Sequence, residues 1–405
     1  MTDLYYDPYD YAIDADPYPV WKRLRDEAPV YENERHGFFA LSRYDDVLRG
    51  LLDNETFQSS HGIVLEMIED EPYENLPMMI MMDPPRHTRL RKLVSRAFTP
   101  RRIADLERKI VAECDELLDA VDGEDEFDYV GRFAGILPPT IILSLVGYPE
   151  GHAQEFRALA DKSLHIEEGS TMQGGGEQGR VLVDEQGGIA NEAFAILPEL
   201  MAQRRADPQD DLITALVFAE IEEDGETRTL TLEEIVAFVQ LLASAGTETV
   251  ARLLGFAAVT LARCPDQRQL LVDDPGLIPN AIEELLRYEA PSPIQGRWVA
   301  RDVEFHGTVI PRGSRLALLN GSGDRDERHF EDPDTFDVRR AIDRHLAFGY
   351  GTHFCIGAAL ARLEGRVALA QTLQRFPTWE VDESGIERVH TSTVRGYTSV
   401  PMRVR

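Results

Sequence analysis

A glycine-rich segment from Phe348 to Gly357 carries the residue with the clearest capacity for chemistry, Cys355. Gly349 and Gly351 permit tight turns before the cysteine, and the residues from Ala358 to Glu364 predict a helix directly after it. The N–H groups and the dipole at a helix N-terminus lower the pKa of a thiol, so we expect a thiolate here. A single thiolate on such a loop suits either a nucleophile or one axial metal ligand, and it excludes a four-thiolate cluster.

The longest helical pattern, from Thr231 to Arg263, has a polar centre that is the second candidate for chemistry. A capping box begins this pattern and a proline ends it. Within the pattern, Gly246 costs about 1 kcal/mol relative to alanine. The neighbouring Glu248 and Thr249 either transfer protons or, in the simpler interpretation, bend the helix through threonine hydroxyl bonds to backbone carbonyls.

Two pairs of charged residues have spacings that place each pair on one helix face. Glu284 and Arg287 are three residues apart, which by itself is typical of a solvated ion pair. His87 and Arg91 are four residues apart and follow a Pro-Pro step, which favours a helix start. A histidine with an arginine suits a carboxylate ligand, because arginine can bind a carboxylate through two hydrogen bonds.

The composition excludes several classes of protein. The 405 residues include 42 Lys and Arg against 72 Asp and Glu, a net charge of −30, whereas nucleic-acid binding needs a basic surface. The three cysteines lie far apart, so no disulfide framework or CxxC zinc site is expected. The chain lacks an apolar stretch of about 20 residues, and its acidic N-terminus does not have the pattern of a signal peptide. We therefore expect a cytoplasmic protein with no nucleic-acid partner and no membrane anchor.

The elements that must position these residues are mostly helical. Hydrophobic periodicity predicts helices over Arg102–Val121, Val130–Val146 and Asp210–Ile221. Strand signals cluster at Tyr31–Leu41, Val299–Ile310, Arg315–Leu319 and near the C-terminus, and a hairpin is predicted from Val303. The Gly-rich segment Gly169–Gly188 is either a mobile surface loop or a functional lid. No repeat or linker divides the chain, so we expect a single domain over residues 1–405.

The pattern FGxGxHxCxGxxLAR around Cys355 resembles the haem-thiolate signature of the cytochrome P450 family, in particular its soluble bacterial members. The resemblance extends over essentially the whole chain. It implies a mainly α fold with small β-sheets, the cytochrome P450 fold, in which a long central helix crosses the haem. It also implies a haem b cofactor whose iron is bound by Cys355, and a thiolate ligand favours cleavage of the O–O bond.

The resemblance assigns roles to the other motifs. Around the polar helix centre, it implies that Thr249 hydrogen-bonds dioxygen, that Glu248 relays protons, and that Gly246 beside Ala245 thins the helix where dioxygen sits. The expected cofactor-binding residues are His87, Arg91, Arg297 and His353, which would hold the propionates, together with Phe348, Gly349 and Gly357. Glu284 and Arg287 would form a structural triad with Arg340, which fits the family spacing better than Arg339.

The implied substrate pocket is formed mainly by aliphatic and thioether side chains, which favours a hydrophobic ligand. Its candidates are Ile63, Leu65, Met78, Met79, Leu241, Leu242, Ala245, Ile294, Gln295 and Val394. Several of them would serve equally well as core. The segment from Asp83 to Arg102 contains seven Lys and Arg residues but only one acidic residue. We expect Arg89, Lys92 and Arg96 of this segment to form a docking surface for an acidic redox protein.

Together these features predict a monomeric haem-thiolate monooxygenase that uses dioxygen and electrons from a separate ferredoxin or flavodoxin. The expected substrate is a hydrophobic small molecule: a fatty acid, a steroid, a terpenoid or a polyketide-like compound. An aromatic-substrate demethylase and an oxidative-coupling enzyme of the same family are the alternatives. A peroxide-driven relative would lack the acid–threonine pair, and a non-catalytic haem-binding sensor is the alternative from another class.

Overall fold

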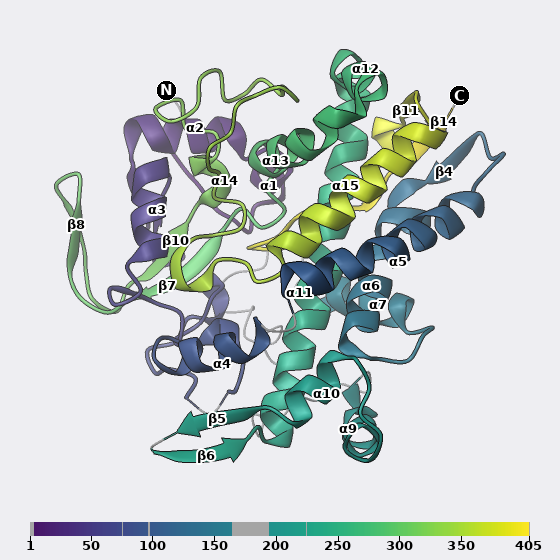
Figure 1. Ribbon diagram of the computed structural model, residues 1–405. Coiled ribbons are helices and arrows are strands. Elements are labelled where there is room, and N and C mark those ends of the chain that lie inside the picture. Colours follow the sequence, from purple (N-terminus) through teal and green to yellow (C-terminus); the bar gives the residue numbers. More distant parts are fainter. Residues whose placement is uncertain (1–3, 75, 96–97, 164–193, 224, 405) are drawn as a thin grey trace.

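The computed structural model describes residues 4–74, 76–95, 98–163, 194–223 and 225–404, and about half of them are helical. The helices are α1 (Tyr11–Ala15), α2 (Tyr18–Glu27), α3 (Tyr44–Leu52), α4 (Arg86–Val94), α5 (Pro100–Asp119), α6 (Leu137–Val146), α7 (Ala153–Ser163), α9 (Leu197–Ala206), α10 (Leu212–Val217), α11 (Leu232–Arg263), α12 (Pro265–Asp273), α13 (Ile278–Tyr288), α14 (Asn320–Gly323) and α15 (Ala358–Arg375). Figure 1 shows α11 passing through the middle of the molecule. The predicted lid, Gly169–Gly188, lies outside the described residues.

The central helix α11 has the extent that its sequence pattern predicts. The Thr231 hydroxyl accepts a hydrogen bond from the Glu234 N–H at 3.2 Å, and the Glu234 carboxylate accepts one from the Thr231 N–H at 2.9 Å. Its 32 residues span about 48 Å at the usual helical rise. By length and composition α11 could cross a bilayer, but 67% of its most apolar window is buried inside the protein. It is therefore a core helix.

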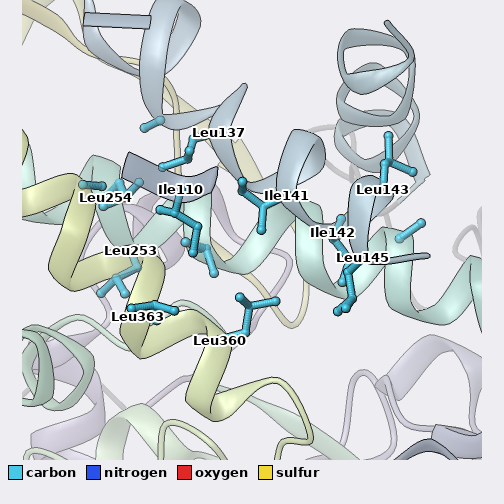
Figure 2. Packing of buried hydrophobic residues seen from close by; sticks show 14 of the residues in the cluster. Ile110, Leu137, Ile141, Ile142, Leu143, Leu145, Leu253, Leu254, Leu360 and Leu363 are labelled. Atoms are coloured by element: carbon cyan, nitrogen blue, oxygen red, sulfur yellow. The ribbon is translucent and has the colours of Figure 1, made fainter. Parts of the chain in front are cut away.

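The largest hydrophobic core lies where α5, α6 and α15 pack around α11. Figure 2 shows side chains from all four helices that belong to this core: Ile110, Leu137, Ile141, Ile142, Leu143, Leu145, Leu253, Leu254, Leu360 and Leu363. Full burial of one such side chain stabilises the fold by about 1.5–3 kcal/mol. The core therefore fixes the polar centre of α11 relative to the start of α15, where Cys355 lies.

The strands form small sheets beside the helices. The largest has the order β1-β2-β10-β7-β3, in which β2 and β10 are parallel and the other neighbours antiparallel. Its strands are β1 (Val30–Asn33), β2 (Phe38–Leu41), β3 (Phe57–Gln58), β7 (Gln295–Val299) and β10 (Arg315–Leu318). A second sheet joins β4 (Glu126–Asp128), β11 (Trp379–Val381) and β14 (Pro401–Val404). The hairpins are β5 (Glu220–Glu223) with β6 (Glu226–Thr229), β8 (Val303–Phe305) with β9 (Thr308–Ile310), and β12 (Glu387–His390) with β13 (Arg395–Ser399).

The mainly α architecture with small sheets and the β8–β9 hairpin are confirmed, but two helix predictions are wrong in part. The pattern over Val130–Val146 is broken into a π-helical turn, η3 (Val130–Ala134), and α6. The break precedes a Pro-Pro step, and proline is tolerated in the first helical turn because its missing N–H has no helical acceptor there. The helix predicted over Asp210–Ile221 ends at Val217, because Glu220–Glu223 pairs with β6 instead.

Candidate active site

Cys355 lies in a tight loop between a short 3₁₀ helix, η6 (Gly351–His353), and the start of α15. The Cys355 N–H donates to the Phe348 carbonyl at 2.9 Å, which closes the loop. Gly349 and Gly351 have φ of 64° and 68°, a region that glycine adopts without strain. Gly357 caps α15, and a Cβ added there would lie 3.9 Å from the Cys355 Sγ. The loop thus holds the thiol against backbone on one side.

The electrostatics at Cys355 differ from the expectation drawn from the sequence. Burial raises the pKa of the Cys355 thiol, although backbone N–H groups of Gly357 and Ala358 and the guanidinium groups of Arg91 and Arg362 act in the opposite direction. The helix start therefore stabilises the thiolate as expected, but desolvation outweighs it. A thiolate at this position needs a further positive charge beside Sγ, and a bound metal ion supplies one.

Three basic side chains, His87, His353 and Arg297, gather near this loop, and the charge of Asp83 acts on two of them, His87 and Arg297. The rings of His87 and His353 lie 4.3 Å apart between centroids. Neither ring nitrogen of His87, nor Nε2 of His353, has a hydrogen-bond partner in the described part of the chain. Arg297 is buried and donates to the Gly296 carbonyl at 2.7 Å. No carboxylate of the described residues forms a salt bridge with Arg297.

All three of these groups have lowered pKa values, and burial is the main cause. Burial lowers the pKa of His87 to about 4, with Arg91 acting in the same direction. Burial lowers the pKa of Arg297 to about 10. Burial, then Arg297, lowers the pKa of His353 far below its usual range. A bound ligand with carboxylate groups would satisfy these donors and restore the charge balance.

Arg91 is turned toward the cysteine loop. It donates a hydrogen bond to the carbonyl of Phe354, the residue before Cys355. Its charge also acts on His353 and on the thiol. Arg91 therefore links α4 to the cysteine loop, a contact that the spacing of His87 and Arg91 did not indicate.

The polar centre of α11 presents two different faces. Ala245 is exposed and Thr249 partly exposed, and the Thr249 hydroxyl donates to the Ala245 carbonyl at 2.9 Å. Glu248 is buried. A Cβ added at Gly246 would lie 2.8 Å from Ile142 of α6. The glycine therefore permits close packing of α6 on α11. The expectation that it also thins the helix where dioxygen sits stays a prediction.

The structure brings Glu284, Arg287 and Arg340 together behind the cysteine loop. Glu284 and Arg287 are completely buried, and two hydrogen bonds of 2.7 and 2.8 Å join them. The Arg340 Nε donates to the Glu284 Oε1 at 3.2 Å. Arg287 also donates to the carbonyls of Asp324 and Pro333, both at 2.9 Å. This buried network joins α13 to the segment that leads into the loop.

Sequence reasoning missed a second support of the loop, formed by Asp324, His345 and Glu283. The Asp324 carboxylate is completely buried and accepts a hydrogen bond from the Leu346 N–H at 2.6 Å. Glu283 accepts hydrogen bonds from His345 at 3.1 Å and from Arg362 at 2.7 and 2.8 Å. No local pattern marks these residues, because their partners are brought near only by the fold.

The predicted pocket residues divide among several clusters. Ile63, Met78 and Leu241 pack in one small cluster between η2 (Met79–Met81) and α11. Met79 and Leu242 belong to the main core instead, and Leu65 and Ile294 belong to the core beneath the N-terminal segment. Val394 is buried, and Gln295 donates to the Ser292 hydroxyl at 2.8 Å.

The basic patch is smaller in the structure than in the sequence. Lys92 is exposed, and Arg89 is partly buried with its guanidinium 3.5 Å from the Glu222 carbonyl. Arg96 lies outside the described residues. Arg102 pairs with Asp210 at 2.7 Å, and Arg91 points inward.

Comparison with known proteins identifies the family. Cytochrome P450 130 of Mycobacterium tuberculosis is 39% identical over 404 residues, an alignment that covers 96% of this chain and 95% of that protein. The chain belongs to the cytochrome P450 family. A family model for cytochrome P450 matches residues 276–399.

Solved structures of P450 enzymes share the fold over almost the whole chain. A mutant of P450 EryK in complex with erythromycin B has a TM-score of 0.85 and 34% identity, and the match covers 97% of each chain. CYP109E1 from Bacillus megaterium in complex with testosterone has a TM-score of 0.84 and 28% identity, covering 96% of this chain and 98% of that one. The P450 fold and a P450 monooxygenase activity follow from these matches.

The residues present fit the haem b of this family. Haem carries two negatively charged propionate groups on one edge. The ring nitrogens of His87 and His353 that lack a partner among the described residues could donate hydrogen bonds to these carboxylates, and Arg297 offers a positive charge. The buried thiol of Cys355, which needs a cation beside it, offers the iron ligand. The groups that would bind the propionates and the thiol that would bind the iron therefore lie in the same region of this P450.

Proposed function

We propose that this P450 inserts one oxygen atom of dioxygen into a hydrophobic small molecule, with electrons from a separate ferredoxin or flavodoxin. The observation that carries the proposal is the acid–hydroxyl pair, Glu248 and Thr249, on the continuous helix α11. Peroxide-driven enzymes and haem-binding sensors do not require such a pair, whereas a monooxygenase must bring protons to the oxygen that it splits.

Each polar group near the cysteine loop has a proposed task. Cys355 would bind the haem iron, and His87, Arg297 and His353 would hold the propionates. Arg91 would assist them while it fixes the Phe354 carbonyl. Phe348, Gly349 and Gly357 would shape the loop around the thiolate, and the Glu284–Arg287–Arg340 network would keep it rigid. When bound, haem with a thiolate ligand supplies the activation of dioxygen and the oxygen insertion.

The residues of α11 would control protons and hydrogen bonds above the haem. The Thr249 hydroxyl donates a hydrogen bond to the Ala245 carbonyl, so its oxygen keeps lone pairs that would accept a further hydrogen bond. Glu248 is buried next to Thr249 in the sequence and would pass protons toward it from solvent. The exposed Ala245 leaves space on the same face.

The proposed substrate is a large apolar molecule. Ile63, Met78 and Leu241 form an apolar cluster beside α11, and methionine adapts its shape to bulky ligands. Two P450 structures similar to this one hold erythromycin B and testosterone. We therefore place polyketide-like compounds and steroids ahead of fatty acids and terpenoids in a binding screen, read by the shift of the Soret band.

A Thr249→Ala variant tests the monooxygenase mechanism directly. The variant loses the hydroxyl and should still consume dioxygen, but with a product yield about tenfold or more below normal. Thr247→Val is the matched control, because Thr247 is a buried threonine of the same helix whose hydroxyl has no partner among the described residues. Product per dioxygen consumed is the measurement, with a surrogate ferredoxin as electron donor. Unchanged coupling in Thr249→Ala would refute the proposed role.

A further inference from the structure

A buried ion pair joins the proposed proton-carrying acid to an arginine one helical turn away. The Arg252 Nη2 lies 3.4 Å from the Glu248 Oε1, and the two side chains are 2% and 5% exposed. The Arg252 Nη1 also donates to the Tyr397 carbonyl at 2.7 Å. The guanidinium thus bridges the catalytic centre of α11 and the strand β13.

Strand β13 packs closely against the side chain of Arg252 at Gly396. A Cβ added at Gly396 would lie 2.5 Å from the Arg252 Cδ, so only glycine fits at that position. The ring of Tyr397 packs edge-on against Phe256 of α11, with centroids 5.3 Å apart. These contacts hold the arginine side chain in place from a segment 145 residues away in the sequence.

These two hydrogen bonds of Arg252 differ in length, and the longer one opens more readily. The bond to the Tyr397 carbonyl is short, whereas the bond to Glu248 is long for a charged pair. Glu248 can therefore leave Arg252 by rotating its side chain, while Arg252 stays on the strand. A carboxylate buried at this depth needs a cation beside it when it has given up its proton.

We propose that Arg252 is a positioning residue that receives the Glu248 carboxylate after each proton transfer and so sets the orientation from which the acid works. The inference rests on the proposed function of Glu248 and Thr249. In each cycle Glu248 gives one proton to the oxygen held beside Thr249 and becomes a carboxylate. It then pairs with Arg252 and regains one proton from solvent before it rotates back.

The experiment is a double-mutant cycle on the haem-loaded protein, with Arg252→Met, Glu248→Gln and the double variant. We expect Arg252→Met to lower product per dioxygen by about threefold or more, because contacting groups are strongly coupled. In the Glu248→Gln background the same substitution should change coupling by less than about twofold. Arg252→Lys retains the charge and should restore most of the coupling. It also keeps the test open if Arg252→Met does not fold.

A second readout does not depend on turnover. In infrared spectra of the ferric protein with ¹³C-labelled glutamate, lowering the pH should produce a carboxylic-acid band for Glu248, which is assigned by its loss in Glu248→Gln. We expect this band to persist to higher pH in Arg252→Met than in the wild type, because the variant lacks the cation that favours the carboxylate. Tyr397→Leu is the control: it disturbs the packing of β13 on α11 but keeps the backbone carbonyl, so it should leave the band unchanged.

The possible results separate the two ideas. If Arg252→Met lowers product per dioxygen by the same factor with and without Glu248→Gln, Arg252 has only a structural role and the inference is overturned. An infrared band that does not change in Arg252→Met overturns the inference as well. If Glu248→Gln alone leaves coupling unchanged, the proposed proton relay fails. In that case a shifted infrared band would still show that Arg252 positions the Glu248 carboxylate.

Discussion

We expect the replacement of Asp324 by asparagine to raise the free energy of unfolding, relative to that of the wild type, as the pH increases. The changed side chain is not among the residues proposed to touch substrate or haem. Asp324 is completely buried behind the cysteine loop. Its Oδ1 accepts a hydrogen bond from the Leu346 N–H, and its Oδ2 has no partner within the described ranges. Asparagine keeps the accepting oxygen and removes the ionisable proton. The substitution therefore isolates the cost of a buried charge at this position.

The sign follows from the pKa of Asp324, which burial raises from 3.8 to about 7 while His345 opposes the shift. Between these values the folded protein keeps a proton that the unfolded chain has lost. Stability therefore falls as the pH rises toward 7 and is constant above it. A shift of about 3 pKa units corresponds to about 4 kcal/mol, of which about 3 kcal/mol lies between about pH 5 and pH 8.

Urea unfolding of the ferric holoenzyme at these two pH values measures the effect. The free energy of unfolding of Asp324→Asn, relative to that of the wild type, should rise by about 3 kcal/mol from about pH 5 to about pH 8. Asp324→Ala is the control, since it also loses the bond to Leu346 and should be less stable than Asp324→Asn at both pH values. A difference between Asp324→Asn and the wild type that does not vary with pH would refute the reasoning.

Three further predictions follow from the contacts around the site. Glu284→Gln should lower the free energy of unfolding by about 3–5 kcal/mol, because it leaves a buried arginine without its carboxylate; the same change at the partly exposed Glu283 should cost less in the same urea titration. Gly246→Ala should lower the free energy of unfolding by about 1–3 kcal/mol through overpacking, and the same change should cost less in an Ile142→Ala background; equal costs in both backgrounds would mean that the two helices are not in the contact described. Lys92→Glu should slow electron transfer from an acidic ferredoxin at low salt, and stopped-flow rates of variant and wild type should converge at high salt. Equal rates at low salt would remove the exposed lysine from the docking surface.

The features that the sequence determined by itself depend on neighbours along the chain. The capping box of α11 joins Thr231 to Glu234, and the loop around Cys355 depends on glycines within a few residues of it. Such patterns fix local backbone geometry directly, because the interacting groups are separated by only one turn. The dense motif around Cys355 was for the same reason enough to indicate the family, and the comparisons confirm it.

The tertiary structure alone decided which distant groups share an environment. Gly246 faces Ile142 of α6, and Arg252 is held by a carbonyl of β13; neither partner is near in the sequence. The raised pKa of Asp324 likewise comes from burial, which is a property of everything packed around the residue. Desolvation and close packing depend on the sum of many contacts between remote segments, so they appear only once the chain has folded.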